Sequence, residues 1–357
     1  MFMAMIKKPN LRDVAEHAGV SIGTVSNVLN RPITVSELTR SRVRASIDAL
    51  GFKQDSKKTN KMDSSSIVGV ILPLSNNAFY AEIAQGIEDS VADQGVSVLI
   101  GYSREDSAIE LHLLTRMMEA GFGAVIVVPV GARSDVFTKF KDGRVRVGYF
   151  SQTEASTEQC TVSIDQVRGG YLGIEYLHSL GHKKVLWISG PDHHHQSNER
   201  FLGITQAAVE FKVELSTMQA PSLDFLSGEY IAPQIIARGP LPDSIFAGND
   251  SLALGIMNYF HKVQISIPED ISILGFDNVA YAESAIVPLT TISQTPYQLG
   301  FTMGQQMLAD LGPQGAHVHQ HVIVQPQLVE RASAKKTLKL TPDHSRTDWS
   351  LSVESTG

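Results

Sequence analysis

The residues best suited to chemistry in this chain are polar side chains that follow short apolar runs. Asn249 and Asp250 end "SIFAGND", Asp277 ends "ILGFDN", and Arg200 opens a helical segment after "WISGP". Guanidinium, carboxylate and amide groups bind hydroxyls, and an aromatic ring stacks on a sugar face. The first apolar run, "IVGVILP", is followed by further candidates, namely Ser75, Asn76, Phe79 and Tyr80. Together these residue types predict a small-molecule site suited to a sugar.

Each of these residues also has an ordinary structural interpretation. Asn and Asp at the end of a strand commonly cap the next helix. Phe79 and Tyr80 are equally suited to a hydrophobic core. The sequence leaves both interpretations open for each residue taken alone.

Alternating apolar strands and amphipathic helices would position these residues. One series begins at "IVGVILP" and runs through "VSVLIGYS", "GAVIVVPV" and "VRVGYF", and a second runs through "KKVLWISG", "SIFAGND" and "ISILGFDN". Strand-helix alternation predicts parallel sheets covered by helices, and roughly 270 residues of it predict two lobes. Because ligands of open parallel sheets bind at the carboxyl ends of strands, we expect a cleft between the lobes.

The start of the chain predicts a different chemistry. "LRDVAEHAGVSIGTVSNVLN", Leu11 to Asn30, holds two short apolar stripes joined at Gly19, with Asn10 and Ser21 as N-caps. This pattern predicts a helix-turn-helix, whose second helix enters the major groove of DNA. A third helix is expected from 36 to 50. The residues expected to face DNA are Ser21, Ile22, Gly23, Thr24, Ser26, Asn27 and Asn30.

Charge divides the chain at the same place. The chain carries a formal net charge of −7, but residues 1–61 hold 11 Lys and Arg against 5 Asp and Glu, which leaves −13 on the remainder. A basic head on an acidic body is typical of nucleic-acid binding, because neutralised phosphates release counterions. Charge alone favours a solvated basic face without a partner, so the helix pattern carries the prediction.

Composition excludes several classes of protein. At 357 residues with 43% hydrophobic residues, the chain is expected to form two or three globular domains. It contains neither a membrane-length apolar run nor a signal peptide, which predicts a cytoplasmic protein with no membrane partner. We find no phosphate loop, nucleophile elbow or coherent acid-base pair, so we expect no enzyme and no cofactor.

Metal binding is also not expected from the sequence. Cys160 is the single cysteine, which excludes an internal disulfide and a cysteine-based structural zinc site, and it has no His nearby in the sequence. The tract "DHHHQ", 192–196, contains adjacent His residues, which rarely converge on one ion. The sequence therefore predicts no functional metal.

The stretch from 11 to 30, followed by "VSELTRSRVRASIDALGF", resembles the headpiece of the LacI/GalR family of bacterial transcription regulators, and the likeness continues to about residue 333. The resemblance implies an α/β protein: an all-α helix-turn-helix headpiece and a two-lobed, periplasmic-binding-protein-like core of parallel sheets. It implies that Ile22, Gly23 and Asn27 sit at base-reading positions and that Thr24 and Ser26 touch phosphates. Gly23 has no side chain with which to read a base. A helix-turn-helix that binds protein is the alternative.

The resemblance also implies an effector site. The family uses an aromatic pair after the first strand, an Arg before "xxG", an aromatic and Asn-Asp on one strand, and an Asp after another. In this chain these positions carry Phe79, Tyr80, Arg200, Phe246, Asn249, Asp250 and Asp277, to which we add Ser75. Phe150 stands where many relatives carry an acid, so one hydroxyl acceptor is expected to be missing.

The linker departs from the family. There a short hinge helix pushes a leucine into the minor groove, following a pattern close to Pro-Asn-x-x-Ala-Arg-x-Leu. Here the Pro, Asn, Arg and Leu positions carry Gln54, Asp55, Thr59 and Lys61. Met62 is the remaining apolar wedge candidate, and Lys57 and Lys58 are expected to meet DNA. A flexible Lys-rich tether is the alternative.

We therefore expect a headpiece at 1–53, a hinge at 54–66, a core at 67–331 and a flexible tail at 332–357. The N-lobe is expected at about 67–163 plus 294–321, and the C-lobe at about 164–293 plus 322–331. The tail lacks leucine heptads, which favours a homodimer over a tetramer and hence a near-palindromic double-stranded operator.

The functional hypothesis is a repressor of a carbohydrate-utilisation operon, controlled by a sugar effector between the lobes. One alternative keeps the DNA role but takes a nucleobase or nucleoside. The other is a cytosolic sugar sensor with weakened DNA binding.

Overall fold

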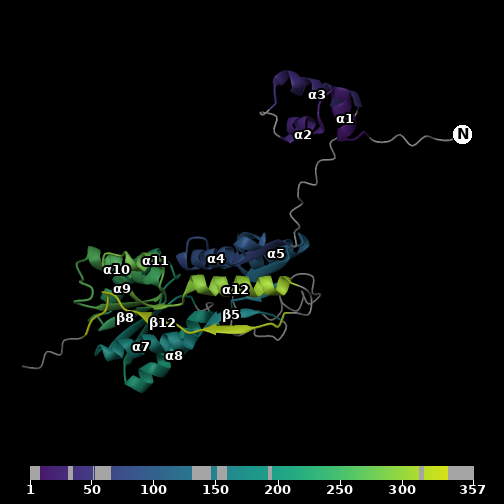
Figure 1. The fold of residues 1–357 in the computed structure, drawn as a ribbon. Coiled ribbons are helices and arrows are strands. Elements are labelled where there is room, and N and C mark those ends of the chain that lie inside the picture. The colour runs from purple at the N-terminus through teal and green to yellow at the C-terminus, as the bar shows by residue number, and fades with distance from the viewer. Residues whose placement is uncertain are drawn as a thin grey trace, which may run out of the picture. The chain divides into compact units, whose positions relative to one another are not determined.

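The structure is a computed structural model that divides the chain into two compact units, Met1–Asp63 and Ser64–Gly357 (Figure 1). The residues it describes are 9–30, 35–50, 52, 66–130, 146–150, 159–191, 195–312 and 317–336. Across these residues, no helix combines the length and apolar character needed to cross a membrane.

The described residues of the first unit form three helices: α1 (Leu11–Ala18), α2 (Ile22–Asn30) and α3 (Glu37–Leu50). Asn10 caps α1 by accepting from the backbone of Asp13, whose carboxylate accepts from the Asn10 N–H in return. Gly19 ends α1 in the left-handed conformation (φ 59), which reverses the chain into α2. A small core packs the three helices together, made by Val14, Ala15, Ala18, Val25, Val28 and Val43. The predicted helix-turn-helix is confirmed.

The second unit contains two sheets, and the first is parallel throughout. Its strands are β1 (Ile67–Leu72), β2 (Ser97–Tyr102), β3 (Ala124–Val127), β4 (Arg146–Tyr149), β5 (Thr161–Ile164) and β11 (His321–Val324), in the order β11-β5-β4-β3-β1-β2. The helical segments around it are α4 (Ala78–Val91), η3 (Ala92–Gln94), α5 (Ser107–Glu119) and α12 (Pro296–Leu311). β1 is buried along its whole length, as expected for a central parallel strand.

The second sheet has the order β12-β10-β9-β8-β6-β7. Its strands are β6 (Lys184–Ser189), β7 (Glu214–Gln219), β8 (Ser244–Ala247), β9 (Ser272–Asp277), β10 (Thr290–Ser293) and β12 (Gln327–Val329). Its helices are α7 (Gln166–Ser179), α8 (His195–Phe211), α9 (Phe225–Ala237), α10 (Asp250–Lys262) and α11 (Ala280–Glu283). Edge strand β12 alone pairs antiparallel in this sheet.

Pairs of glycines bring neighbouring helices into backbone contact. The first sheet and its helices form the first lobe, and the second sheet and its helices form the second. In the first lobe α12 lies against α4 (Figure 1), where a Cβ on Gly86 would overlap the carbonyl oxygen of Tyr297. In the second lobe a Cβ on Gly170 of α7 would overlap the carbonyl oxygen of Arg200 on α8. This close packing fixes the helices that carry the polar residues of the site.

The chain changes sheet after β5, after β10 and after β11. These crossings place the carboxyl ends of both sets of parallel strands toward one another, as a cavity lined by both lobes requires. The predicted fold class, a helical headpiece followed by a core of two largely parallel sheets, is confirmed.

Candidate functional site

The DNA-facing candidates lie together on one side of α2. Ser21, Ile22, Gly23 and Asn27 are exposed, whereas Val25 and Val28 point into the headpiece core. The side chain of Ile22 is 45% exposed, which is unusual for an aliphatic residue with a core within reach. α2 therefore presents a face that is available to a partner.

The remaining DNA-binding candidates are either partly buried on α2, at its cap or end, or outside the described residues. The Ser21 hydroxyl accepts from the Thr24 backbone N–H at 3.1 Å and lies 2.8 Å from the Thr24 hydroxyl, which caps α2. Thr24 and Ser26 are half-buried, and Asn30 ends the helix. Lys57, Lys58 and Met62 lie outside the described residues, as do residues 192–194 and 337–357.

Both lobes contribute to a small polar cavity at the carboxyl ends of the strands. Its volume is about 50 Å³, and its walls include Phe79, Tyr80 and Glu105 from the first lobe and Arg200, Asn249 and Asp277 from the second. Beside it the lobes touch, because the Ala280 N–H donates to the Glu82 carboxylate at 3.3 Å. Of the nine effector candidates, the structure brings five together here.

Arg200 is the central charged group of this cavity. Its Nε and Nη2 donate to Gln166 Oε1 at 3.0 and 2.9 Å, and its Nη1 donates to the carbonyl oxygen of Gly248. The guanidinium carbon lies 3.5 Å from the centre of the Phe276 ring, a cation-π contact. Burial lowers the pKa of Arg200 to about 10, and Asp277 and Tyr80 oppose this fall. The guanidinium therefore stays charged at neutral pH.

Asp277 accepts a hydrogen bond from Gln294 Nε2, and Gln294 Oε1 accepts in turn from Gln166 Nε2 at 2.8 Å. Arg200, Gln166, Gln294 and Asp277 thus form a continuous hydrogen-bonded relay between a buried cation and a buried carboxyl. Burial raises the pKa of Asp277 to about 7, although Arg200 and Gln294 lower it. Its carboxyl therefore titrates near neutral pH.

The backbone at Asp277 is in an unusual conformation. Asp277 has φ 116 and Asn278 has φ 60, both on the side of the Ramachandran map that favours glycine. Residues held in such conformations cluster at binding sites, where the surrounding structure compensates the strain. Here Arg331 donates to Asn278 Oδ1 at 2.7 Å and holds the turn.

Three residues of the relay and its surroundings, Gln166, Gln294 and Phe276, were not predicted from the sequence. Gln294 directly follows β10, so the strand-end criterion that selected Asn249 would also have selected it. Gln166 opens α7 after β5. No local pattern marks Phe276, whose role depends on an arginine far away in the sequence.

Two of the predicted effector residues, Asp250 and Asn249, form hydrogen bonds that stabilise the second lobe itself. Asp250 is fully buried, accepting from the Thr291 hydroxyl at 2.6 Å and from the Val279 N–H at 2.9 Å. Burial raises its pKa well above the ordinary value. Asn249 does line the cavity, but its side chain also caps α10 and donates to the Leu223 carbonyl at 3.0 Å. Asp250 therefore ties the turn after β9 to strand β10 and is not a lining residue.

Phe246, Phe150 and Ser75 are placed differently from the expectation. Phe246 lies in the core of the second lobe, with ring centres 5.2 Å from Trp187 and 6.4 Å from Phe276, because its side of β8 faces α7. Phe150 is buried in a hydrophobic core at the end of β4. Ser75 is exposed and does not line the cavity. Phe276, at the end of β9, is the aromatic residue that contacts Arg200.

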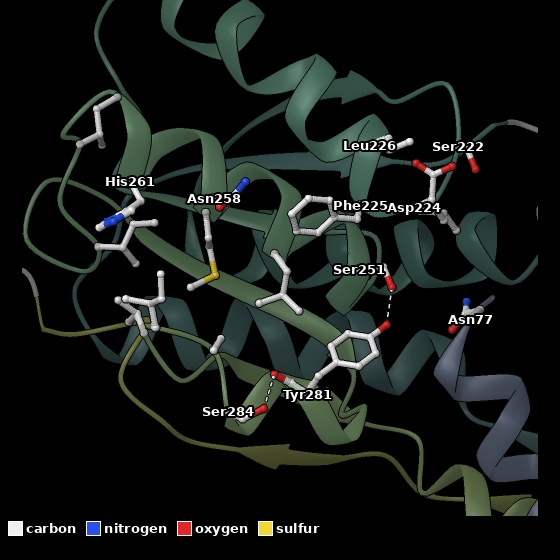
Figure 2. A pocket seen from close by; sticks show the side chains of 18 of the residues that line it. Asn77, Ser222, Asp224, Phe225, Leu226, Ser251, Asn258, His261, Tyr281 and Ser284 are labelled. Atoms are coloured by element: carbon white, nitrogen blue, oxygen red, sulfur yellow. Dashed lines mark hydrogen bonds between the residues drawn. The ribbon is translucent and has the colours of Figure 1, made fainter.

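A much larger groove adjoins this cavity. It lies between α9, α10, α11 and the loops at 264–269 and 284–287 of the second lobe (Figure 2), and it is also lined by Leu74, Asn77 and Glu105 of the first lobe, which line the cavity as well. This α9–α11 groove has a volume of about 980 Å³. Figure 2 shows Phe225 and Tyr281 on its walls, with the Tyr281 hydroxyl 2.8 Å from the Ser251 hydroxyl. Its rim exposes large apolar side chains, with Leu226 72% and Ile286 79% exposed. The sequence did not predict this surface.

Two regions of the chain match known protein families. Residues 10–55 match the bacterial regulatory proteins of the lacI family, and residues 174–334 match the periplasmic binding protein-like domain. The first region covers the headpiece helices, and the second covers most of the second lobe together with α12.

Individual proteins align with most of the chain. The HTH-type transcriptional repressor PurR of Klebsiella pneumoniae (strain 342) is 29% identical over 328 residues, covering 90% of this chain and 96% of that protein. A LacI family transcriptional regulator from Enterococcus faecium with bound ribose is 26% identical, with a TM-score of 0.68, over 76% of this chain and 99% of that chain. The lac repressor dimer bound to operator and the anti-inducer ONPF is 23% identical, with a TM-score of 0.70, over 92% of this chain and 100% of that chain.

Proposed function

The chain belongs to the LacI family of bacterial transcription regulators, and we propose that it is a repressor whose hold on operator DNA is set by a sugar bound between its lobes. Its relatives are transcriptional regulators, which confirms the expectation that it is not an enzyme. The observation that carries the sugar proposal is the relay from Arg200 to Asp277, which faces a cavity shared by both lobes.

The chemistry of the cavity fits a polyhydroxylated ligand. Arg200 supplies N–H donors, Asp277 supplies an acceptor, and both are buried, so each hydrogen bond to a hydroxyl forms where water competes little. Tyr80 adds an aromatic ring and a hydroxyl on the opposite lobe. The Enterococcus faecium relative was solved with bound ribose, which is a ligand of this class.

The size of the cavity supports a switch. A water molecule requires at least about 10–15 Å³ by the same measure, so about 50 Å³ holds a few waters and no sugar. A sugar therefore needs more space than this cavity alone provides, and a movement of the lobes or of the Arg200 side chain would supply it. Because the ligand binds one arrangement better than the other, it shifts their populations, and a ligand of equal affinity would shift nothing.

Base reading is assigned to the exposed face of α2. Asn27 can pair with the edge of an adenine, and Ile22 can pack on a thymine methyl. Ser21, Thr24 and Ser26 are suited to phosphate oxygens.

Replacing Asn27 with Ala should cost about 1–3 kcal/mol of binding free energy at one base position of each half-site and relax the base preference there. Measured affinities for operators varied at single positions check this result.

The control for Asn27 is Ser41→Ala, a change at an exposed position of α3. The control should keep the full pattern of base preferences. An unchanged pattern in the Asn27→Ala protein as well would remove Asn27 from the readout.

We assign the α9–α11 groove to a second copy of the chain. Exposed aromatic and aliphatic side chains around a groove of about 980 Å³ are typical of a buried interface and unusual on a monomer. A two-fold dimer presents two headpieces to DNA and requires a near-palindromic operator. The lac repressor, whose fold this chain shares, was solved as a dimer on its operator.

Replacing Leu226 with Glu should convert the dimer into monomers, because a carboxylate would be buried without a partner at the interface. Sedimentation at micromolar concentration measures the mass directly. Val209→Glu is the matched control, since Val209 lies on α8 and is 76% exposed. A Leu226→Glu protein that stays dimeric would place the interface elsewhere.

The decisive experiment is selection of binding sites from a random DNA pool, followed by release assays with sugars, nucleobases and nucleosides. We expect the protein to select a near-palindromic site and to be released from this DNA by one class of sugar. Release by a nucleobase or nucleoside would support the regulatory role but would show that the effector is not a sugar. In Asp277→Asn, DNA binding should persist while release is lost. Failure of folded full-length protein to select any site would favour a sugar sensor with weakened DNA binding.

A further inference from the structure

The amino-terminal edge of the first sheet carries a cysteine and two histidines in mutual contact. Cys160 directly precedes β5, and His317 and His319 precede β11, the neighbouring strand. Cys160 Sγ lies 3.0 Å from His317 Nε2 and 3.6 Å from His319 Nδ1, and all three ligand atoms lie within 4.8 Å of one another. Cys160 has no histidine near it in the sequence; the contact joins residues 157 positions apart, and the expectation of no functional metal did not take it into account.

We propose that Cys160, His317 and His319 bind one zinc ion. Thiolate sulfur and imidazole nitrogen are the donors that zinc prefers, and three protein ligands leave a fourth position for water or another small ligand. With Zn–S near 2.3 Å and Zn–N near 2.0–2.1 Å, tetrahedral geometry separates sulfur from nitrogen by about 3.6 Å. His319 already lies at that distance, and His317 has to withdraw by roughly 0.6 Å.

The backbone holds these side chains in place without a metal. The Tyr149 N–H donates to the Cys160 carbonyl at 3.1 Å, and the Thr161 N–H donates to the Gln320 carbonyl at 2.9 Å. Cys160 is fully buried and both histidines are half-buried, with ring centres 5.2 Å apart in an edge-to-face arrangement. Side chains held by hydrogen-bonded strands need little reorganisation to coordinate an ion.

Binding has an identifiable cost. Burial raises the pKa of the Cys160 thiol, so the sulfur carries a proton until the ion displaces it. Each zinc bound as a thiolate therefore releases one proton to solvent, and no oxidant or reductant is needed. Asp310 lies close enough to influence Cys160 but already pairs with Arg146 at 3.2 Å.

The cluster lies away from the cavity that is proposed to bind a sugar. Every strand of a parallel sheet begins at the same edge, so the cluster lies at the edge opposite the interlobe cavity. The chain enters the second lobe after β5 and again after β11. A bound ion would cross-link the starts of these two strands, at the end opposite to the crossings. Zinc binding at this edge would not depend on which effector the cavity takes.

The test is zinc binding to the full-length protein, reduced and free of any histidine tag. Competition with a chelator of known affinity should give one zinc per chain. Cobalt(II) in place of zinc should give the near-ultraviolet absorption of a cobalt–thiolate bond, which reports Cys160 directly. In Cys160→Ser and in His319→Gln, zinc affinity should fall at least about a hundredfold. His321→Gln is the matched control and should bind as the wild type does, because His321 contacts Thr161 at 2.9 Å and lies outside the three ligands.

Two outcomes would overturn the proposal. One is absence of stoichiometric zinc on the wild-type protein. The other is zinc retained at full affinity in both variants, which would place the ion elsewhere on the chain. If Cys160→Ser does not fold because it alters a buried position, His319→Gln and the cobalt spectrum of the wild type still decide, since His319 is half-buried.

Discussion

Replacing Gly203 with Ala should lower the free energy of unfolding of the second lobe by about 3 kcal/mol, near the upper end for overpacking a single methyl group. A Cβ at this position on α8 would overlap the backbone carbonyl oxygen of Val167 on α7. Backbone cannot rotate away as a side chain can, so the two helices have to separate. Gly170, on the facing helix, makes the reciprocal contact with the Arg200 carbonyl.

The same separation should disturb the cavity. Arg200 lies one turn before Gly203 on α8, and Gln166 opens α7, so the contact between these helices sets the two Arg200–Gln166 hydrogen bonds at 3.0 and 2.9 Å. We therefore expect loss of the sugar response at temperatures where the variant is still folded.

Urea unfolding followed by Trp187 fluorescence measures this effect, because Trp187 is buried in the core of the second lobe. Thr205→Ala, an exposed change on the same helix, is the matched control and should shift the free energy by less than about 0.5 kcal/mol. Equal stability of the two variants would show that α7 and α8 separate without cost, contrary to their backbone contact at Gly203.

The sequence predicted those features that depend on neighbours along the chain. Asn10, Gly19 and Ser21 act on residues two to four positions away, so the order of residues alone was enough to assign caps and turns. The strand-helix alternation is equally local, and it was sufficient for two lobes. Arg200, Asp277 and Tyr80 could be placed in one cavity because parallel strands share a carboxyl edge.

The rest depended on contacts that no local pattern records. Gln166 and Gln294 are 128 positions apart, and neither residue type marks a site by itself. Phe246 and Phe276 lie in the same core of the second lobe, and no local pattern shows that Phe276 is the one in contact with Arg200. Cys160 was classified by its sequence neighbours, whereas its spatial neighbours come from the start of β11.

Without ligand, the protein should lose stability as pH rises from about 4 to about 7, and Asp277 should be a principal cause. Burial raises the pKa of Asp277 to about 7 in the folded protein, whereas an Asp in an unfolded chain titrates near ~3.9. Between these values the folded state keeps a proton that the unfolded state has released, so the free energy of unfolding falls as pH rises. At about 1.4 kcal/mol for each pKa unit, the complete loss attributable to Asp277 is on the order of 4 kcal/mol.

Asp277→Asn removes this titration and retains an oxygen that accepts from Gln294 Nε2. Its unfolding free energy should therefore fall less steeply over the same pH range, and Asp250 and Glu82, whose pKa values burial also raises, should contribute to the remaining slope. Urea unfolding at several pH values compares the variant with the wild type and with Asp93→Asn, an exposed control in η3. Parallel profiles for all three proteins would mean that Arg200 keeps Asp277 ionised throughout. The carboxyl would then meet a sugar as a permanent anion rather than as a group that titrates near neutral pH.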